Sequence, residues 1–188
     1  MEKILWIDME MTGLNVEKEV PIEIAAVITD INLEPIDTYH TVIRQPQEYL
    51  DAMDDWNKDH HGKSGLTERV PFGKKPEVVE QELIALVNRH FPENGDPPVL
   101  AGNSIAQDRA FLNRYMPKFA EGLHYRMLDV TAWKLVFNNF FEIKYEKGDA
   151  AHRAIEDIQQ SINELKFYLD HITLKRPKTT TNSDSGLA

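Results

Sequence analysis

The sequence predicts an α/β protein with a mixed sheet and helices on both faces of that sheet. Three β-rich segments follow one another near the start, which favours a three-strand antiparallel meander. Further along, short apolar segments alternate with helix-like ones, the pattern of a sheet covered by helices. With 188 residues, of which 41% are hydrophobic and 28% charged, the chain is long and apolar enough for one folded, water-soluble domain.

The meander is expected in the first quarter of the chain. Residues 3–9 form an apolar run that predicts a buried strand ending at Asp8, and Thr12-Gly13 supplies a turn soon after. Residues 22–30 and 38–43 predict the second and third strands, with short polar connections between them. Residues 46–75 have no regular pattern, so we expect short helices and loops there.

The remaining elements should alternate between helix and strand. Pro76 opens a helix that runs to about His90, and residues 99–101 form a short strand before a helix at about 107–115. A strand at 125–128 and a helix at 130–138 follow. The last helix is amphipathic, because its apolar residues recur at spacings of three and four: Ile155, Ile158, Ile162, Leu165, Leu169 and Ile172.

The composition along the chain predicts the domain boundary and the cellular location of the protein. We expect a single domain at 1–174 and a disordered tail at 175–188, where Lys, Thr and Ser leave almost nothing to bury. No segment reads as an export signal or a membrane span, and the cytoplasm is the expected location.

Charge and cysteine content restrict the chemistry. There are 21 Lys+Arg, 31 Asp+Glu and no cysteine, which gives a net charge of −10 and removes thiolate nucleophiles and thiolate metal sites. The acidic balance argues against coating long nucleic acids, because such binding depends on many contacts between basic residues and phosphates. A short phosphate-bearing ligand held through cations remains compatible with it.

Carboxylates gather at the predicted strand ends. Asp8 and Glu10 are two residues apart in a strand, so their side chains point to the same face, a pattern that a solvated strand end would also show. Asp108 follows the strand at 99–101, and Asp157 lies on the last helix. His152 precedes Asp157 by five positions, a rotation of about 140° on a helix, so the two converge only if His152 lies at or before the first turn.

Four carboxylates without thiolates suit Mg²⁺ or Mn²⁺, which prefer oxygen ligands. Two such ions about 4 Å apart can activate water and stabilise the leaving oxygen when a phosphodiester is cleaved. Four such carboxylates are therefore compatible with metal-dependent phosphodiester hydrolysis.

These residues resemble the three motifs of the DEDD exonuclease superfamily in its histidine-containing subclass, and within it the oligoribonuclease family. The similarity spans roughly Ile4 to Leu174 and has five ordered segments: Trp-Ile-Asp-Met-Glu-Met-Thr-Gly-Leu at 6–14, Met-Asp-Asp-Trp-Asn at 53–57, Ser-Gly-Leu at 64–66, Gly-Asn-Ser-Ile-Ala-Gln-Asp-Arg at 102–109 and His-Tyr-Arg-Met-Leu-Asp-Val at 124–130. The chain departs from the family pattern at Asn15, at Thr131, where the family commonly has Ser, and in the loop His60-His61-Gly62.

The resemblance implies a ribonuclease-H-like fold and a homodimer that removes nucleotides from the 3′ end of short RNA, especially dinucleotides, releasing nucleoside 5′-monophosphates. It implies that Asp8, Glu10, Asp108 and Asp157 hold two divalent cations, Mg²⁺ or Mn²⁺, and that His152 is the general base. Leu14 and Trp56 would flank the two bases, and Tyr125 would reach a neighbouring subunit's site. The other implied contacts to phosphate or sugar come from His61, Ser104, Gln107, Arg126 and Thr131.

Several residues also have simpler interpretations. Trp56 alone would fit a core or interface aromatic, and adjacent histidines such as His60 and His61 are expected to be ordinary surface residues rather than a metal pair. Asp129 suits a helix N-cap better than a further metal ligand, and Met9 and Met11, like Met53, are expected to pack in the core.

Two alternatives to a dinucleotide-degrading enzyme remain open. One is a proofreading or tRNA-trimming exonuclease of the same superfamily that acts on longer substrates, which should carry a basic approach surface. The other is a non-catalytic module that binds nucleic acid or protein and keeps the fold.

Overall fold

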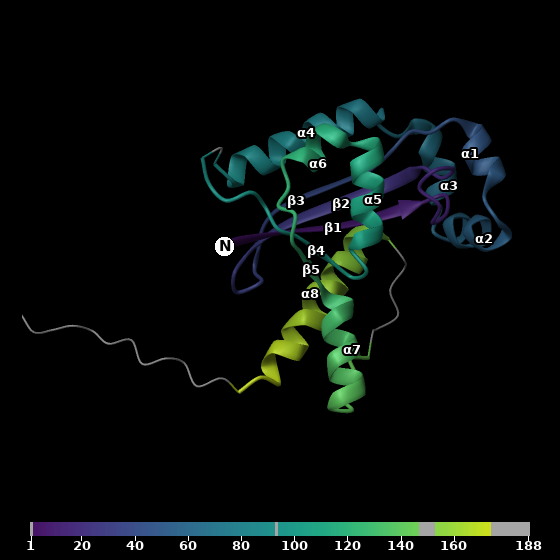
Figure 1. Ribbon diagram of the computed structural model, residues 1–188. Helices are drawn as coiled ribbons and strands as arrows, with labels where there is room; N and C mark the ends of the chain where they lie inside the picture. Colours follow the sequence, from purple (N-terminus) through teal and green to yellow (C-terminus); the bar gives the residue numbers. More distant parts are fainter. Residues whose placement is uncertain (1, 93, 147–152, 174–188) are drawn as a thin grey trace, which may run out of the picture.

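The computed structural model describes residues 2–92, 94–146 and 153–173. The expected tail and His152 lie outside these ranges. Fourteen elements are assigned within them (Figure 1): β1 Lys3–Met11, β2 Pro21–Asp30, β3 Pro35–Val42, α1 Gln47–Ala52, α2 Asp55–Lys63, α3 Leu66–Arg69, the 3₁₀ turn η1 Val70–Phe72, α4 Pro76–His90, β4 Leu100–Gly102, α5 Ala106–Tyr115, α6 Pro117–Glu121, β5 Met127–Asp129, α7 Val130–Phe140 and α8 Ala154–Asp170.

The sheet is mixed, in the order β3-β2-β1-β4-β5. The first three strands are antiparallel neighbours, which confirms the predicted meander, whereas β4 pairs with β1 and β5 in parallel. Parallel neighbours need long connections, which explains why helices separate β1 from β4 and β4 from β5 in the chain. β2 is buried over nearly its whole length because both of its faces are covered.

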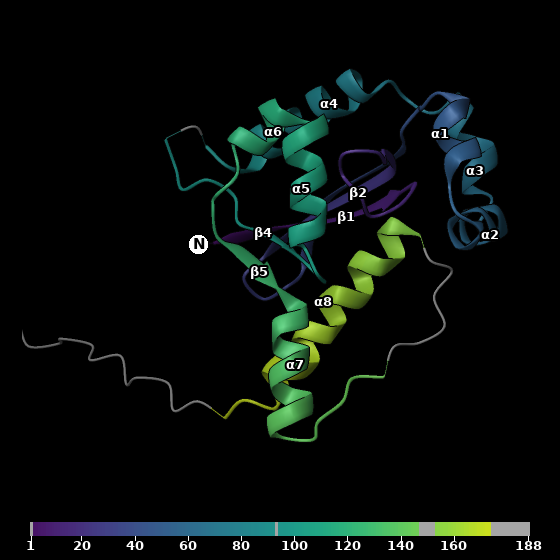
Figure 2. The same cartoon turned by 45° about the vertical axis from the view of Figure 1, so that its right-hand side comes forward.

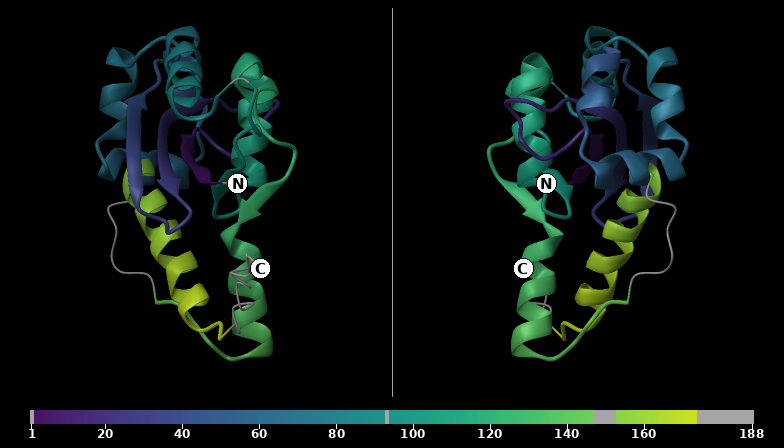
Figure 3. Two further views of the ribbon diagram at one scale, coloured as in Figure 1. Left: turned by 90° about the vertical axis from the view of Figure 1, so that its left-hand side faces the viewer. Right: turned by 90° about the vertical axis from the view of Figure 1, so that its right-hand side faces the viewer.

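Helices cover the two faces of the sheet with two separate cores. Odd residues of β1, such as Leu5 and Ile7, join a core with α4, α5 and α6, while even residues, such as Ile4 and Trp6, join a core with α7 and α8. Figures 2 and 3 show α7 and α8 extending from the side of the sheet opposite α4. The alternation predicted from the strand period therefore decides which helices each side chain of β1 meets.

The irregular segment after β3 forms α1, α2, α3 and η1, as expected, and it packs at the end of the sheet toward which β1 points (Figure 1). A third core cluster holds this unit against β2 through Ile22 and includes Leu50, Met53 and Leu66. No helix among the described residues is long and apolar enough to cross a membrane.

Candidate active site

Three acidic side chains meet at the end of β1. Asp8 and Glu10 follow Ile4 and Trp6 on the face that α8 covers, and Asp157 lies in the first turn of α8. Asp8, Glu10 and Asp157 each offer a carboxylate oxygen, and these oxygens all lie within 4.8 Å of one another. The alternation of β1 and the amphipathic face of α8 thus bring together residues about 150 positions apart.

Asp108 approaches the same strand end from the other face. It lies in the first turn of α5, whose Phe111 and Leu112 pack into the core formed with the odd residues of β1. It is not part of the three-carboxylate group, but its charge acts on Glu10, and the backbone of Met9 hydrogen-bonds to it. The four predicted acids are therefore neighbours: Asp8, Glu10 and Asp157 form one group, and Asp108 lies beside it.

This concentration of acids is electrostatically unfavourable without cations. Burial, together with the nearby charge of Asp157, raises the pKa of Glu10 to about 8. Burial also raises the pKa of Asp108 to about 7, although backbone hydrogen bonds oppose that rise. A divalent ion would relieve both effects, and the donors are all oxygen atoms, so the group fits the hard cations expected from the sequence.

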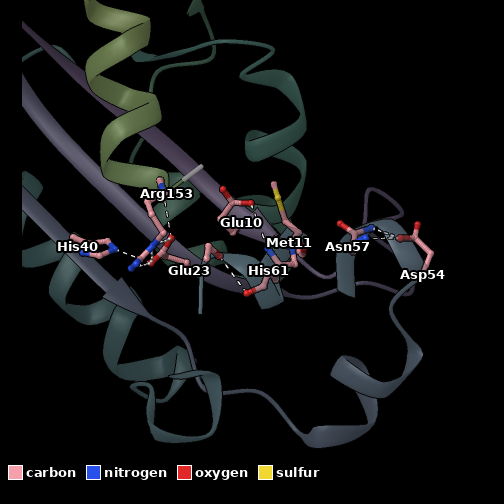
Figure 4. Close-up of polar contacts among 10 residues, drawn as sticks. Glu10, Met11, Glu23, His40, Asp54, Asn57, His61 and Arg153 are labelled. Carbon is pink, nitrogen blue, oxygen red and sulfur yellow. Dashed lines mark hydrogen bonds and ion pairs between the residues drawn. The ribbon is translucent and has the colours of Figure 1, made fainter. Parts of the chain in front are cut away.

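A fifth acid, Glu23, lies beside Glu10, and sequence reasoning missed it. Glu23 on β2 is the register partner of Glu10 on β1, and its side chain is fully buried. Arg153 binds it with Nη2–Oε1 at 2.6 Å, His40 lies with Nε2 at 2.9 Å from Oε1, and the amide of Ala154 donates to Oε2 at 3.3 Å (Figure 4).

The contacts of Glu23 decide its charge. Burial would raise its pKa, but the hydrogen bonds from His40, Arg153 and Ala154 outweigh burial and hold the pKa at about 2. Glu23 is thus an ionised structural carboxylate that fastens the start of α8 to β2. The available signal was its place in the apolar run Ile22-Glu23-Ile24, because a charge buried in a strand has to be paired.

His61 corrects the expectation that both adjacent histidines are ordinary surface residues. It is only 2% exposed, and its Nε2 donates to the backbone oxygen of Met11 at 2.8 Å. Its Nδ1 lies 3.9 Å from Oε2 of Glu10 (Figure 4). Burial lowers the pKa of His61, which favours the neutral ring. His61 is buried because of how α2 lies. The helix begins after its N-cap Asp54, which accepts from the Asn57 amide, and its His61 side packs against the end of β1.

Two exposed apolar side chains lie on segments that adjoin the end of β1, namely the loop that follows it and α2. Trp56 in the first turn of α2 is 68% exposed and stacks on His60, with ring centroids 4.7 Å apart. Leu14 is 76% exposed in the loop after β1, and Gln107 holds this loop by donating Nε2 to the Leu14 carbonyl at 2.6 Å. A hollow between α2 and the start of α8 is lined by Trp56, Asp59, His60, Lys63, Ser64, Arg153 and Glu156.

The residues predicted after β4 and β5 form a second polar cluster. The Ser104 amide donates to Asp129 Oδ1 at 3.0 Å and to Thr131 Oγ1 at 2.9 Å. Asp129 is the N-cap of α7, accepting from the Thr131 amide at 2.9 Å, which confirms the capping role expected for it. Ser104 has a positive φ of 51°, an unusual conformation for a residue other than glycine, and these hydrogen bonds hold it there.

The segment before β5 is exposed. Tyr125 is 74% exposed and lies between His124, on which its ring stacks, and Arg126, whose guanidinium is 5.0 Å from the ring centroid. The described contacts do not bring Tyr125 or Arg126 to the acidic group of the same chain. Met9, Met11 and Met53 are buried, as expected of packing residues.

Comparison with known proteins identifies relatives along nearly the whole chain. The sequence profile described as Exonuclease matches residues 5–165. The mitochondrial oligoribonuclease of Homo sapiens is 42% identical over 180 residues, 93% of this chain and 75% of the relative. The oligoribonuclease of Bordetella pertussis is 42% identical over 174 residues, 90% of this chain and 95% of the relative. That of Azoarcus sp. is 44% identical over 172 residues, 89% of this chain and 93% of the relative.

Solved structures are similar in fold. Zinc-bound E. coli exonuclease I in complex with single-stranded DNA has a TM-score of 0.70 at 13% identity, covering 88% of this chain and 40% of that one. Exonuclease I from Methylocaldum szegediense has a TM-score of 0.69 at 15% identity, and the match covers 91% of this chain and 41% of that one. The chain spans about two fifths of these longer chains, and at this identity the likeness confirms the expected ribonuclease-H-like fold.

Proposed function

The chain belongs to the exonuclease family and, within it, to the oligoribonucleases, and from this we propose that it degrades short single-stranded RNA from the 3′ end to nucleoside 5′-monophosphates. Dinucleotides are the preferred substrate in this proposal. The observation that carries it is the convergence of Asp8, Glu10 and Asp157 at the end of β1, with Asp108 beside them. The profile match at 5–165 supports treating residues 1–174 as one exonuclease domain.

Two Mg²⁺ or Mn²⁺ ions are the proposed cofactors. Asp8, Glu10 and Asp157 would hold one, and Asp8 and Asp108 would serve the other directly or through water. Bound ions of this kind supply the Lewis acidity that activates water and stabilises the leaving oxygen. The chain's own contribution is to hold the oxygen donors. Asp8 and Glu10 lie on β1 where it pairs with β2, and the Glu23–Arg153 ion pair joins the start of α8, which carries Asp157, to that same strand.

His152 is the proposed general base, which takes a proton from the attacking water. An unperturbed histidine has a pKa near 6.5, so its neutral form is available at neutral pH. His152 immediately precedes Arg153, which is bound to Glu23 at the start of α8. His152 is therefore the direct sequence neighbour of a residue, Arg153, whose side chain is bound to Glu23 next to Glu10.

The proposed restriction to short RNA rests on exposed side chains at the same strand end. Trp56 offers an exposed ring face to a base, and Leu14 offers an apolar contact in a loop that Gln107 fixes. Ser104, Thr131, His61 and Arg126 are proposed to contact phosphate or sugar. Of these, His61 is buried next to Glu10, so its proposed contact lies at the acids themselves.

We also propose a homodimer. Supporting it, the described residues leave an apolar surface uncovered at α7, where Leu135 and Phe140 are 57% and 79% exposed and Phe141, directly after the helix, is 61% exposed. Tyr125 is exposed, and its described contacts are with His124 and Arg126 rather than with the acids at the end of β1, which suits a role across subunits. Sedimentation of the wild type and Phe140→Asp checks this: a dimer that the substitution dissociates supports the proposal, and a monomeric wild type contradicts it. The cytoplasmic location stays a prediction.

The function is tested with end-labelled RNAs of two to twenty nucleotides, incubated with Mn²⁺ or with EDTA. The proposal predicts Mn²⁺-dependent release of nucleoside 5′-monophosphates, fastest for dinucleotides. Faster cleavage of the longest RNAs would favour the proofreading or trimming exonuclease, and binding without cleavage would favour the non-catalytic module.

A further inference from the structure

Glu10 also faces the two histidines of α2. A backbone carbonyl only accepts hydrogen bonds, so the contact of His61 Nε2 with the Met11 carbonyl at 2.8 Å places the ring proton on Nε2. In the neutral ring Nδ1 then carries the lone pair, and Nδ1 is the atom that faces Glu10 Oε2 at 3.9 Å. His61 is 2% exposed, so this lone pair points into a protected space at the end of β1.

His60 adds a second imidazole to the same place. One ring nitrogen of His60, one of His61 and one carboxylate oxygen of Glu10 all lie within 4.8 Å of one another. The two imidazole rings are nearly perpendicular, with centroids 5.4 Å apart, and Trp56 stacks on His60 with an interplanar angle of 11°. Stacking on Trp56 therefore fixes the plane of the His60 ring, and the hydrogen bond to the Met11 carbonyl fixes the orientation of the His61 ring.

The spacing is compatible with one bound ion. Two ligands that are each about 2.1 Å from a zinc ion lie no more than about 4.2 Å apart. The contact between His61 and Glu10 already meets this limit, and His60, which is only partly buried, needs a small side-chain adjustment at most. Two imidazole nitrogens and one carboxylate oxygen match the ligand preference of Zn²⁺ and Ni²⁺, whereas Mg²⁺ prefers oxygen donors alone.

We propose that Glu10, His60 and His61 form a separate binding site for a borderline divalent ion, with Zn²⁺ as the representative, and that its occupancy inhibits the enzyme. Glu10 belongs to both groups, so an ion held by the two histidines withdraws this carboxylate from Asp8 and Asp157. The binding part stands on the geometry of the three side chains. The inhibitory part rests on the proposed function.

The binding test uses metal-stripped protein titrated with ZnCl₂ in a calorimeter. His60→Phe keeps an aromatic ring to stack on Trp56 but removes the ligand nitrogen, and His171→Phe removes a histidine at the far end of α8 as the matched control. We expect the tightest Zn²⁺ binding event to weaken at least 10-fold in His60→Phe and to stay within about twofold in His171→Phe. Equal Zn²⁺ affinity in wild type and His60→Phe overturns the site.

An activity assay in excess Mg²⁺ tests the inhibitory part. The proposal predicts that His60→Phe needs at least 10-fold more Zn²⁺ than the wild type for half-inhibition of RNA cleavage. If both proteins are inhibited at the same Zn²⁺ concentration, the inhibitory part is wrong. If the wild type cleaves no RNA, the proposed function fails, and the calorimetric result still decides the metal site.

Discussion

Arg153 binds Glu23 with two guanidinium nitrogens, Nη2 at 2.6 Å and Nε at 3.1 Å from Oε1, across 130 positions of sequence. Glu23 is fully buried and is paired across the sheet with Glu10, while Arg153 is the N-cap residue of the helix that carries Asp157. The ion pair therefore fixes the position of one proposed metal ligand relative to another. We regard Glu23 and Arg153 as positioning residues.

Arg153→Met should destabilise the fold and weaken divalent-cation binding, because the buried Glu23 carboxylate beside Glu10 loses its guanidinium partner and keeps only His40 and the Ala154 amide. Removing one partner of a buried pair costs about 3 kcal/mol. Lys166→Met is the matched control. Lys166 also lies on α8, and its substitution breaks only a solvent-exposed pair with Glu34, which should cost less than about 1 kcal/mol. Urea unfolding measures stability, and the Mg²⁺ concentration for half-maximal cleavage measures positioning. An unchanged Mg²⁺ dependence in Arg153→Met would reduce the pair to a purely structural role.

The stability that Glu23 contributes should depend on pH in acid. Its pKa is about 2 in the folded protein and near 4.5 when unperturbed, so the unfolded chain binds the proton first as pH falls. The contribution is complete above about pH 5 and is lost as pH falls toward 2. Among the described residues, the charged and titratable groups near Glu23 are His40, Arg153, Glu10 and His61. Asp37, also with a pKa of about 2, titrates in the same window elsewhere.

Comparing wild type with Glu23→Gln removes the contribution of Asp37, because both proteins contain it. We expect the difference in unfolding free energy between them to be largest at pH 6 and to shrink steadily down to pH 2.5. A difference that stays constant over this range would mean that the folded pKa of Glu23 is not lowered.

Trp56→Ala should weaken dinucleotide binding by roughly 5- to 150-fold, because base stacking on an aromatic ring is worth about 1–3 kcal/mol. Phe72→Ala is the matched control, as Phe72 is an exposed aromatic on η1 that is 90% exposed. Binding is measured by calorimetry with a non-hydrolysable dinucleotide. Equal affinities of Trp56→Ala and Phe72→Ala would assign Trp56 to another role.

His152→Ala should lower turnover by about 10²–10⁴-fold, the usual contribution of a general base. Metal and RNA binding should persist, since the imidazole is not a proposed ligand. Single-turnover rates with Mn²⁺, together with metal titrations, separate the two effects. A loss of metal affinity as large as that of Asp157→Asn would make His152 a ligand instead of a base.

The strand and helix periods were enough to predict the meander, the amphipathic last helix and the shared face of Asp8 and Glu10, whereas the meeting of Asp157 with them was implied by the resemblance to the exonuclease motifs. The first three features depend on local repeats of two and 3.6 residues, which the sequence displays directly. The pairing of Glu23 with Arg153 could not be located this way, because it joins residues far apart in sequence. Likewise, nothing in the residues around His61 shows that α2 turns it toward the end of β1.

The central claim is that the carboxylates at the end of β1 bind the cations that permit RNA cleavage, and Asp157→Asn tests it most directly. Dinucleotide cleavage is measured at saturating Mn²⁺ for the wild type, Asp157→Asn and the control Asp170→Asn, which changes an exposed acid at the other end of α8. The account predicts at least a 100-fold loss of cleavage in Asp157→Asn alone. Its metal-free form should melt at a higher temperature, because the charge that Asp157 imposes on Glu10 is removed. Near-wild-type, Mn²⁺-dependent cleavage by folded Asp157→Asn would contradict the account.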